Sequence, residues 1–162
     1  MPFSHSSFRV IWDRAGGREQ ACCKTCGIQH SKGYTLDCSH LDHTRDELYD
    51  DPNRGVLECL QCHLRRHISI YFYCLLKDKK KKLKEARYAC QSLVFRIVAG
   101  EDRWDGESIP NSKSDIKKAK QNIDKIFSFQ LSILISEALD VGYHKADLKA
   151  AIRKVNHLRM MV

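Results

Sequence analysis

The sequence predicts an α+β fold in which a small, metal-stapled finger is followed by a mostly helical C-terminal extension. Four of the 8 cysteines in this chain of 162 residues form two C-x-x-C pairs, a spacing typical of metal sites. Little regular periodicity appears between the pairs, whereas apolar residues recur at intervals of three and four through the second half. We therefore expect a helix or arm over residues 1–19, a metal-stapled core over 20–70 and a basic helical extension over 71–162.

The first half of the chain predicts short elements. Ile11 and Trp12 lie on one face of a short N-terminal helix, which Gly16 and the glycine after it end. Residues 33–36 and 55–57 have the composition of short strands. A bound metal would help to stabilise a small fold of this kind, because its core is modest.

The second half predicts three helices. Apolar periodicity over residues 68–97 indicates one long buried face. Ser112 and Asp115 stand three apart, as in a helix cap, before a second amphipathic run that Gly142 ends. Residues 144–159 form the third periodic run.

Charge is distributed unevenly along the chain. Residues 1–67 carry 9 basic and 9 acidic side chains and so have no net charge. Residues 68–162 carry 19 basic and 11 acidic side chains and supply the whole net charge of +8. This excess favours an anionic partner, nucleic acid first. No apolar run is long enough to span a membrane or to serve as a secretory signal, so we expect an intracellular protein in the cytoplasm, without a membrane partner.

The two C-x-x-C pairs predict a structural zinc site. The pairs, separated by 32 residues, are Cys23 with Cys26 and Cys59 with Cys62. A two-residue gap lets both thiolates of a pair reach one ion, and two such turns complete a tetrahedral sulfur site. Cys22 could replace Cys23, but only Cys23 keeps the gap. The simpler alternative, in which these cysteines are small buried apolar residues, also applies to the unpaired Cys38, Cys74 and Cys90.

Histidines gather between and just after the cysteine pairs. His40, Asp42 and His43 stand between the pairs, whereas His63 directly follows the last cysteine and His67 stands four residues further on. Residues four apart on a helix share one face, so His63 and His67 could hold one ion. A second structural zinc and simple surface histidines are the alternatives.

At these residues the sequence resembles the HNH, or His-Me finger, endonucleases. That family's pattern is a first cysteine knuckle, a His after a strand, an Asn in the connecting loop, and then C-x-x-C-His on a helix. Asn53 and His63 match the loop and helix positions, and the resemblance covers roughly residues 20–70. The strings His40-Leu-Asp-His43 and Arg54-Gly-Val-Leu57 look most like the recombination endonuclease VII branch.

The resemblance implies a ββα-metal finger that hydrolyses DNA phosphodiester bonds. A His would act as general base and one divalent cation, usually Mg²⁺ and otherwise Mn²⁺ or another ion, would balance charge on the phosphate. It also implies branched DNA as a substrate, a homodimer that cuts opposite strands, and a phage or mobile-element origin in a host cytoplasm. The chain departs from that branch at His63, where the branch has Asn, and at Thr44 or Arg45, where it has a further catalytic His.

The identity of the base stays open. In one interpretation His43 is the base and Asp42 binds the metal with His63 and His67. In another His40 is the base, which places Ser39 where a ligand is expected. A strand over residues 38–43 would place His40 and Asp42 on one face, so that both could bind metal.

Several cations are candidates for contact with DNA phosphates. Arg65 and Arg66 lie beside the start of the expected catalytic helix, and Arg45 follows the His-rich segment. Lys79 and Lys80 open a run of four lysines, for which a solvated helix face is the simpler explanation. The rival interpretation of the whole chain is a non-catalytic, zinc-stapled module that binds nucleic acid.

Overall fold

The computed structural model describes residues 3–41, 47–102 and 112–160. The chain divides into two compact units: unit 1 comprises residues 1–63 and 101–109, and unit 2 comprises residues 64–100 and 110–162. Helices and a two-stranded antiparallel sheet occur together, which confirms the α+β class. Within the described residues no helix is both long and apolar enough to cross a membrane.

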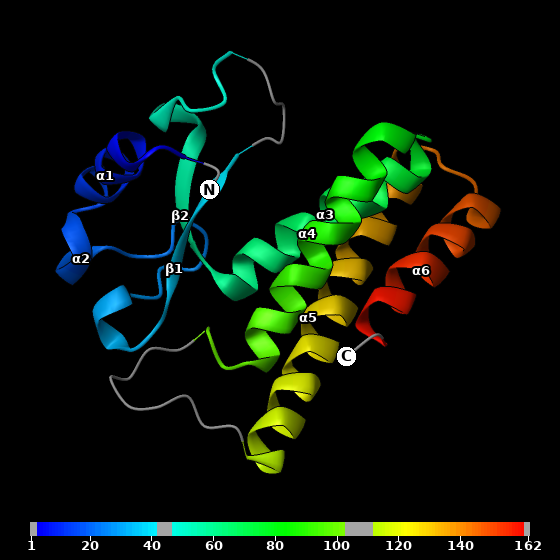
Figure 1. Cartoon of the computed structure of the whole chain (residues 1–162). Coiled ribbons are helices and arrows are strands. Elements are labelled where there is room, and N and C mark those ends of the chain that lie inside the picture. The colour runs from blue at the N-terminus through cyan, green and yellow to red at the C-terminus, as the bar shows by residue number, and fades with distance from the viewer. Residues whose placement is uncertain (1–2, 42–46, 103–111, 161–162) are drawn as a thin grey trace. The chain divides into compact units, whose positions relative to one another are not determined.

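Unit 1 is built from short helices around the two-stranded sheet, and it ends in the first turn of a longer helix (Figure 1). Its elements, in chain order, are α1 (His5–Arg14), α2 (Gly17–Gln20), η1 (His30–Lys32), β1 (Leu36–His40), η2 (Pro52–Arg54), β2 (Gly55–Cys59) and the start of α3 (Leu60–Leu76).

The N-terminal helix α1 lies within the expected segment 1–19 and ends just before Gly16, as the sequence predicts. The Ser4 side chain caps it by accepting a hydrogen bond of 3.3 Å from the backbone N–H of Ser7. After the helix ends at Arg14, Gly16 takes the left-handed conformation with φ of 95°. Ile11 and Trp12 are buried on the face that packs in the core of this unit.

The strands pair in antiparallel register, from Leu36 opposite Cys59 to His40 opposite Gly55. Because successive side chains of a strand alternate between faces, each strand has one face in the core and one face outside it. The core face is apolar and packs with α1; its buried members are Phe3, Ile11, Trp12, Ala21, Cys23, Leu36, Leu57, Cys59 and Cys62.

Unit 2 is helical. It contains the rest of α3, then α4 (Lys80–Val98), α5 (Lys113–Asp140) and α6 (Lys145–Arg159). Apolar side chains at intervals of three and four are buried in it, among them Phe72, Val94, Ile97, Ile123, Phe127, Leu134, Val155 and Leu158. The expected cap of α5 is confirmed, because the Ser112 hydroxyl accepts a hydrogen bond of 3.1 Å from the backbone N–H of Asp115.

The single long helix expected over residues 68–97 is wrong, because the structure has two helices there. Asp78 takes the left-handed conformation with φ of 48°, and the Lys79 N–H donates to the Cys74 carbonyl at 3.1 Å. This six-residue bond is the Schellman closure of a helix end. Aspartate tolerates the left-handed region better than most residues, so the chain can stop and restart without glycine.

Candidate metal centre and polar cluster

Four cysteines from two separate segments of unit 1 meet at one point. We call Cys23, Cys26, Cys59 and Cys62 the sulfur cluster. All their sulfur atoms lie within 4.8 Å of one another, and the Sγ atoms of Cys26 and Cys59 are 3.8 Å apart. The structure therefore confirms that the two C-x-x-C pairs converge on a cluster that could hold a metal ion.

Backbone geometry forms the first turn of the sulfur cluster. The Cys23 N–H donates to the Ile28 carbonyl at 2.8 Å, and the Gly27 N–H donates to the Cys23 carbonyl at 2.9 Å. Gly27 has φ of 77°, a conformation that favours glycine directly after the second cysteine. A bond of 2.9 Å from the Lys24 N–H to the Leu57 carbonyl fixes this turn beside β2.

The second pair comes from a strand end and a helix start. Cys59 is the last residue of β2, and Cys62 lies in the first turn of α3. Four sulfurs bound to zinc at about 2.3 Å stand about 3.8 Å apart at the corners of a tetrahedron. The Cys26–Cys59 separation of 3.8 Å equals this edge, and all four sulfurs lie within 4.8 Å of one another, so the cluster is compact enough for a closed tetrahedral ion. Cys22 is exposed and stands outside the cluster, which leaves Cys23 as the member with the two-residue gap.

The thiols of the sulfur cluster are strongly coupled. Hydrogen bonds from Cys59 and Cys62 hold the pKa of the Cys23 thiol far below its usual range. The same contact with Cys23 raises the pKa of Cys59 to about 12 and raises that of Cys62 as well. The cluster favours the thiolate form of Cys23 and the neutral thiol form of Cys59 and Cys62. A bound cation would remove this conflict, because it would bind all four sulfurs as thiolates.

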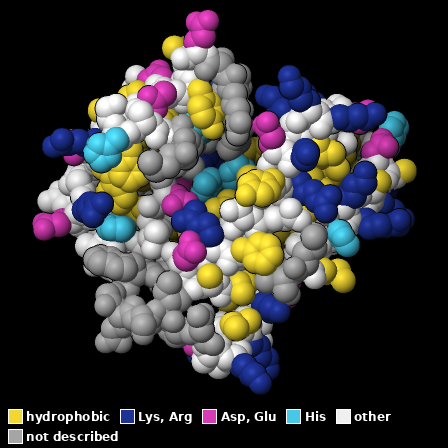
Figure 2. Space-filling view, in the orientation of Figure 1, with side chains coloured by type: hydrophobic (Ala, Val, Ile, Leu, Met, Phe, Trp, Pro, Cys, Tyr) yellow, Lys and Arg dark blue, Asp and Glu magenta, His cyan; other side chains and the backbone are white. Residues whose placement is uncertain are grey.

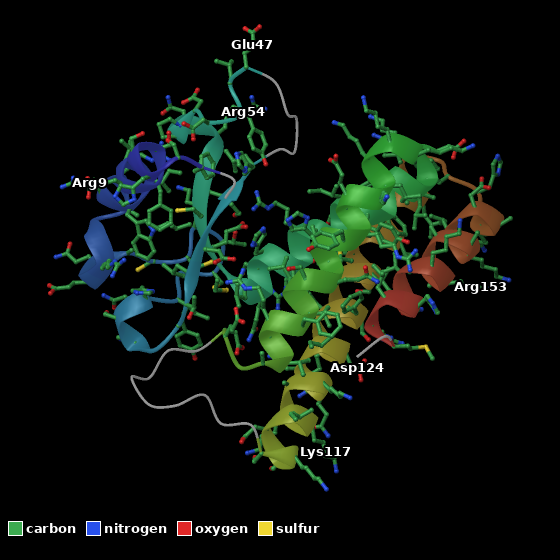
Figure 3. All side chains as sticks on the ribbon, viewed as in Figure 1. Arg9, Glu47, Arg54, Lys117, Asp124 and Arg153 are labelled. Carbon is green, nitrogen blue, oxygen red and sulfur yellow. The ribbon has the colours of Figure 1, made fainter. Side chains whose placement is uncertain are left out.

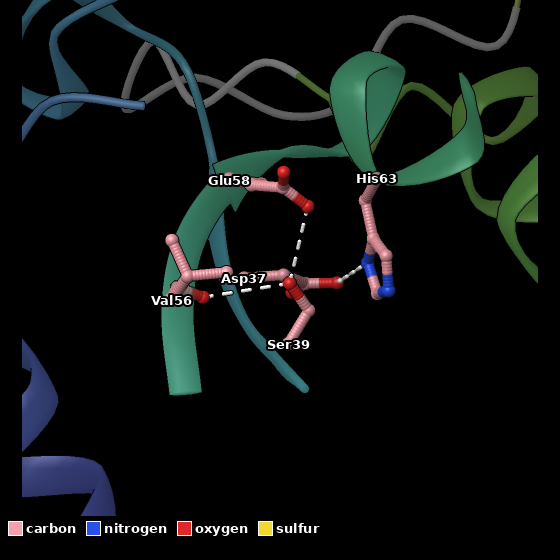
Figure 4. A network of polar contacts seen from close by, with 5 residues as sticks. All are labelled: Asp37, Ser39, Val56, Glu58 and His63. Carbon is pink, nitrogen blue, oxygen red and sulfur yellow. Dashed lines mark hydrogen bonds and ion pairs between the residues drawn. The ribbon is translucent and has the colours of Figure 1, made fainter. Parts of the chain in front are cut away.

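A second group of polar side chains lies on the sheet face turned away from the apolar core. We call Thr25, Asp37, Ser39, Glu58 and His63 the polar cluster. Asp37 and Glu58 are directly opposite each other in the strand register. The Glu58 carboxylate accepts hydrogen bonds from the Thr25 hydroxyl at 2.8 Å and from the Ser39 hydroxyl at 3.3 Å (Figure 4 shows the second).

His63 brings an imidazole to this face from α3. Its Nδ1 atom lies 3.5 Å from Oδ2 of Asp37, and the two side chains point toward each other in Figure 4. The side chains of His63 and Asp37 are 14% and 21% exposed, so the pair is partly open to solvent, although the Nδ1 atom itself is buried. Glu58 is buried beneath them at 5% exposed.

The electrostatics of the polar cluster favour a cation. Two carboxylates at directly opposite positions of a strand pair repel each other, and burial of Glu58 strengthens any charge interaction there. The carboxylate and imidazole atoms of this cluster are more widely spaced than the sulfurs: within the described part of the chain only the sulfur cluster has three or more metal-binding groups mutually within 4.8 Å.

The structure does not bring His40 to the polar cluster. His40 lies on the core face of β1 with Cys38, is 2% exposed, and stacks on Phe3 at 3.9 Å and on Tyr49 at 4.1 Å between ring centroids. Its Nε2 atom is 2.8 Å from the Tyr49 carbonyl oxygen. Asn53 is also apart from the cluster: it is exposed in η2, where its Oδ1 accepts a bond of 3.4 Å from Arg14.

Other expected site residues fall outside unit 1 or outside the described residues. Asp42, His43 and Arg45 lie outside the described residues. His67 is buried one turn after His63 on α3 and belongs to unit 2.

The expected phosphate contacts of unit 2 differ in their surroundings. The Arg65 guanidinium lies 5.3 Å from the centre of the Phe129 ring. Arg66 is half-buried, whereas Lys79 and Lys80 are exposed where α4 begins.

Sequence reasoning missed four members of the polar cluster: Thr25, Asp37, Ser39 and Glu58. The alternation of residues along β1 could have revealed two of them. In the string Leu36-Asp-Cys-Ser-His40, successive side chains point to opposite faces of a strand, which places Asp37 and Ser39 together on one face. Only the register with β2 could add Glu58 to that face.

No protein-family model, no curated protein and no solved structure matches this chain.

Proposed function

We propose that this protein is a metal-dependent DNA endonuclease of the HNH type, in which a structural zinc positions the polar cluster that hydrolyses phosphodiester bonds. One observation carries the proposal. Members of the polar cluster are sequence neighbours of members of the sulfur cluster: Glu58 directly precedes Cys59 in β2, and His63 directly follows Cys62 in α3. An ion in the sulfur cluster would therefore hold β2 and α3 in the arrangement that sets His63 against Asp37.

Zinc is the ion that suits the sulfur cluster. Four cysteine ligands form a closed site with no open position for a substrate, so the ion would stabilise the fold without taking part in the reaction. Its binding free energy would add to the folding free energy of a unit with a small core.

The polar cluster has the ligand chemistry for a second, hydrated cation. Mg²⁺ usually keeps several waters and binds through one or two carboxylates, so Asp37 and Glu58 would suffice without a complete protein cage. Such an ion, when bound, would stabilise the charge that develops on the phosphate and on the leaving oxygen. Mn²⁺ meets the same oxygen ligands and is the alternative.

His63 is the proton acceptor that this geometry favours. With Nδ1 facing Asp37, the carboxylate can favour a proton on that nitrogen, and Nε2 is then the atom that would take a proton from an attacking water. His43 as base and Asp42 as ligand remain predictions from the sequence, and His43→Ala tests them in the same assay.

DNA is the substrate that the charge supports. The whole net charge of +8 comes from residues 68–162, and a basic surface of this size binds phosphates without reading sequence. The resemblance to the recombination endonuclease VII branch further implies branched DNA and a homodimer.

Plasmid nicking tests the proposal. Zinc-loaded protein is incubated with supercoiled plasmid and Mg²⁺, and EDTA serves as the control. We expect His63→Ala to lose cutting by at least about a hundredfold, as for loss of a general base, while it keeps its zinc and its thermal unfolding temperature. His5→Ala, an exposed histidine of α1, is the matched control and should cut like the wild type.

Three results would contradict the proposal or part of it. Wild type that cuts no better than a His40→Ala/His43→Ala/His63→Ala triple variant has no histidine-dependent activity. If the wild type binds DNA but does not cut it in the presence of any divalent cation, the protein is the non-catalytic, zinc-stapled binding module. Loss of zinc from His63→Ala would move His63 to a structural role.

A further inference from the structure

A groove of about 1020 Å³ opens within unit 2, lined by side chains from α4, α6 and the end of α3. It belongs to this unit alone, and neither the sulfur cluster nor the polar cluster includes any of its residues. Cations form the edges of this groove, and apolar side chains form its floor.

The edges of the groove are two stripes of positive charge. The residues of α4 follow one another at intervals of four and three, and those of α6 at intervals of four, so each set lies on one face of its helix. Every one of these side chains is exposed, and the described lining includes no acidic residue. The stripes are Lys80, Lys84 and Arg87 on α4 and Lys149 and Arg153 on α6, with His157 one turn further along α6.

Lys and Arg side chains gather over α4 and α6 in the space-filling view of Figure 2. Figure 3 labels Arg153, which projects from α6. Along each helix, cations four residues apart stand about 6 Å from one another, so each edge is a row of regularly spaced charges.

The floor of the groove has a different chemistry. Leu75, Leu83 and Ile152 are half-buried there, so part of each apolar side chain stays in contact with solvent. The Oδ1 atom of Asn156 is buried beside them and has no hydrogen-bond partner among the described residues. A ligand that covers this floor would bury apolar area and could donate to that oxygen.

We infer that this groove binds a single strand of nucleic acid, with phosphates along the two charged edges and bases against the floor. A single strand combines one negative charge per nucleotide with flat, apolar base faces, which is the combination that the edges and floor complement. Duplex DNA turns its bases inward, so it would neutralise the edges but leave the floor in water. The choice of nucleic acid over another anionic polymer rests on the proposed function.

A binding measurement without added divalent cation separates this inference from the proposed cleavage. The probe is fluorescein-labelled oligo(dT) of about ten nucleotides, with fluorescence anisotropy as the readout on the full zinc-loaded chain. We expect oligo(dT) to bind more tightly than a duplex of equal length, and more tightly than an acidic amphipathic peptide of equal charge.

Charge reversal locates the site. Lys84→Glu/Arg153→Glu removes one cation from each edge, and it should weaken oligo(dT) binding by at least about tenfold. It should also reduce the slope of log K against log salt by about 1.4, because each phosphate contact on a single strand contributes about 0.7. Lys117→Glu/Lys120→Glu, on exposed positions of α5 outside the groove, is the control with the same change of charge.

A floor variant keeps the inference distinct from simple charge attraction. Ile152→Asn should weaken oligo(dT) binding and leave the salt slope unchanged, provided that its thermal unfolding matches the wild type; if it does not, Leu83→Asn replaces it. The inference is overturned if the edge variant binds like its α5 control, if duplex binds as tightly as oligo(dT), or if the acidic peptide binds more tightly. The last result would make the groove a site for an acidic protein. If binding behaves as expected while no variant or wild type cuts plasmid, the groove stands and the nuclease proposal fails.

Discussion

Gly55 allows α1 to pack against β2, and Gly55→Ala tests this packing. A Cβ atom at this position would lie 2.3 Å from Cδ1 of Ile11 and 2.8 Å from Cζ of Phe3. Carbon atoms in contact normally stand about 3.5–4.0 Å apart, so Ile11 must move by more than about 1 Å or α1 must shift. Backbone strain plays no part, because Gly55 has φ of −103°.

The expected destabilisation follows from two opposing effects. Overpacking of a close-packed core costs about 1–3 kcal/mol, whereas replacing glycine by alanine lowers the entropy of the unfolded chain and returns about 0.4–1 kcal/mol. The net loss in the free energy of unfolding is therefore about 1–2 kcal/mol. For a chain of this size that corresponds to a fall of about 2–8 °C in Tm.

A double-mutant cycle identifies the contact responsible. Ile11→Val removes the clashing Cδ1 atom and alone should cost about 0.5–1.5 kcal/mol. The double variant Gly55→Ala/Ile11→Val should lose less stability than the two single variants added together. The difference, measured by urea unfolding of the zinc-loaded protein, should be at least about 0.5 kcal/mol. Strict additivity, or a Gly55→Ala variant as stable as the wild type, would refute the close approach of α1 to β2.

Three further predictions follow from single contacts. Cys26→Ala should abolish tight zinc binding and lower the stability of unit 1, whereas Cys22→Ala, one exposed cysteine outside the sulfur cluster, should change neither; metal analysis after gel filtration checks both. Ser112→Ala should cost about 1 kcal/mol by removing the cap of α5, and Ser114→Ala within the helix should cost nothing, as measured by thermal unfolding; equal effects would refute the cap. Hydrogen bonds from Ser4 lower the pKa of Asp50 below 3.8. The carboxylate therefore stabilises the fold above that pH, and this contribution is lost as the pH falls through the lowered value. Asp50→Asn should remove this pH dependence of stability, and an NMR titration that places the pKa of Asp50 at or above 3.8 would contradict the prediction.

Local signals in the sequence predicted much of the architecture. The two-residue gap predicted which cysteines converge, because the turn between two ligands is a property of the adjacent chain. Ser112 predicted the start of α5 for the same reason, since a cap bonds within one turn. The break at Asp78 was missed because the polar stretch around it leaves the apolar periodicity on both sides in phase, and a left-handed aspartate has no distinctive sequence pattern.

The polar cluster could not be predicted from local signals. Alternation correctly puts Cys38 and His40 on one face of a strand, but it does not say which face enters the core. In the structure His40 stacks on Tyr49 and on Phe3, and the contact with Phe3 joins residues 37 positions apart in the sequence. With His40 turned inward, Asp37 lies on the outer face, where the helix brings His63.

The metal content of the purified protein tests the central claim most directly. The account predicts one tightly held zinc per chain, and replacement by Co²⁺ should give the intense visible absorption of a tetrahedral ion with sulfur ligands, which Cys59→Ser and Cys62→Ser both weaken. Protein that folds without any bound metal, or a cobalt spectrum that neither substitution changes, would contradict an ion in the sulfur cluster and with it the positioning of His63 against Asp37.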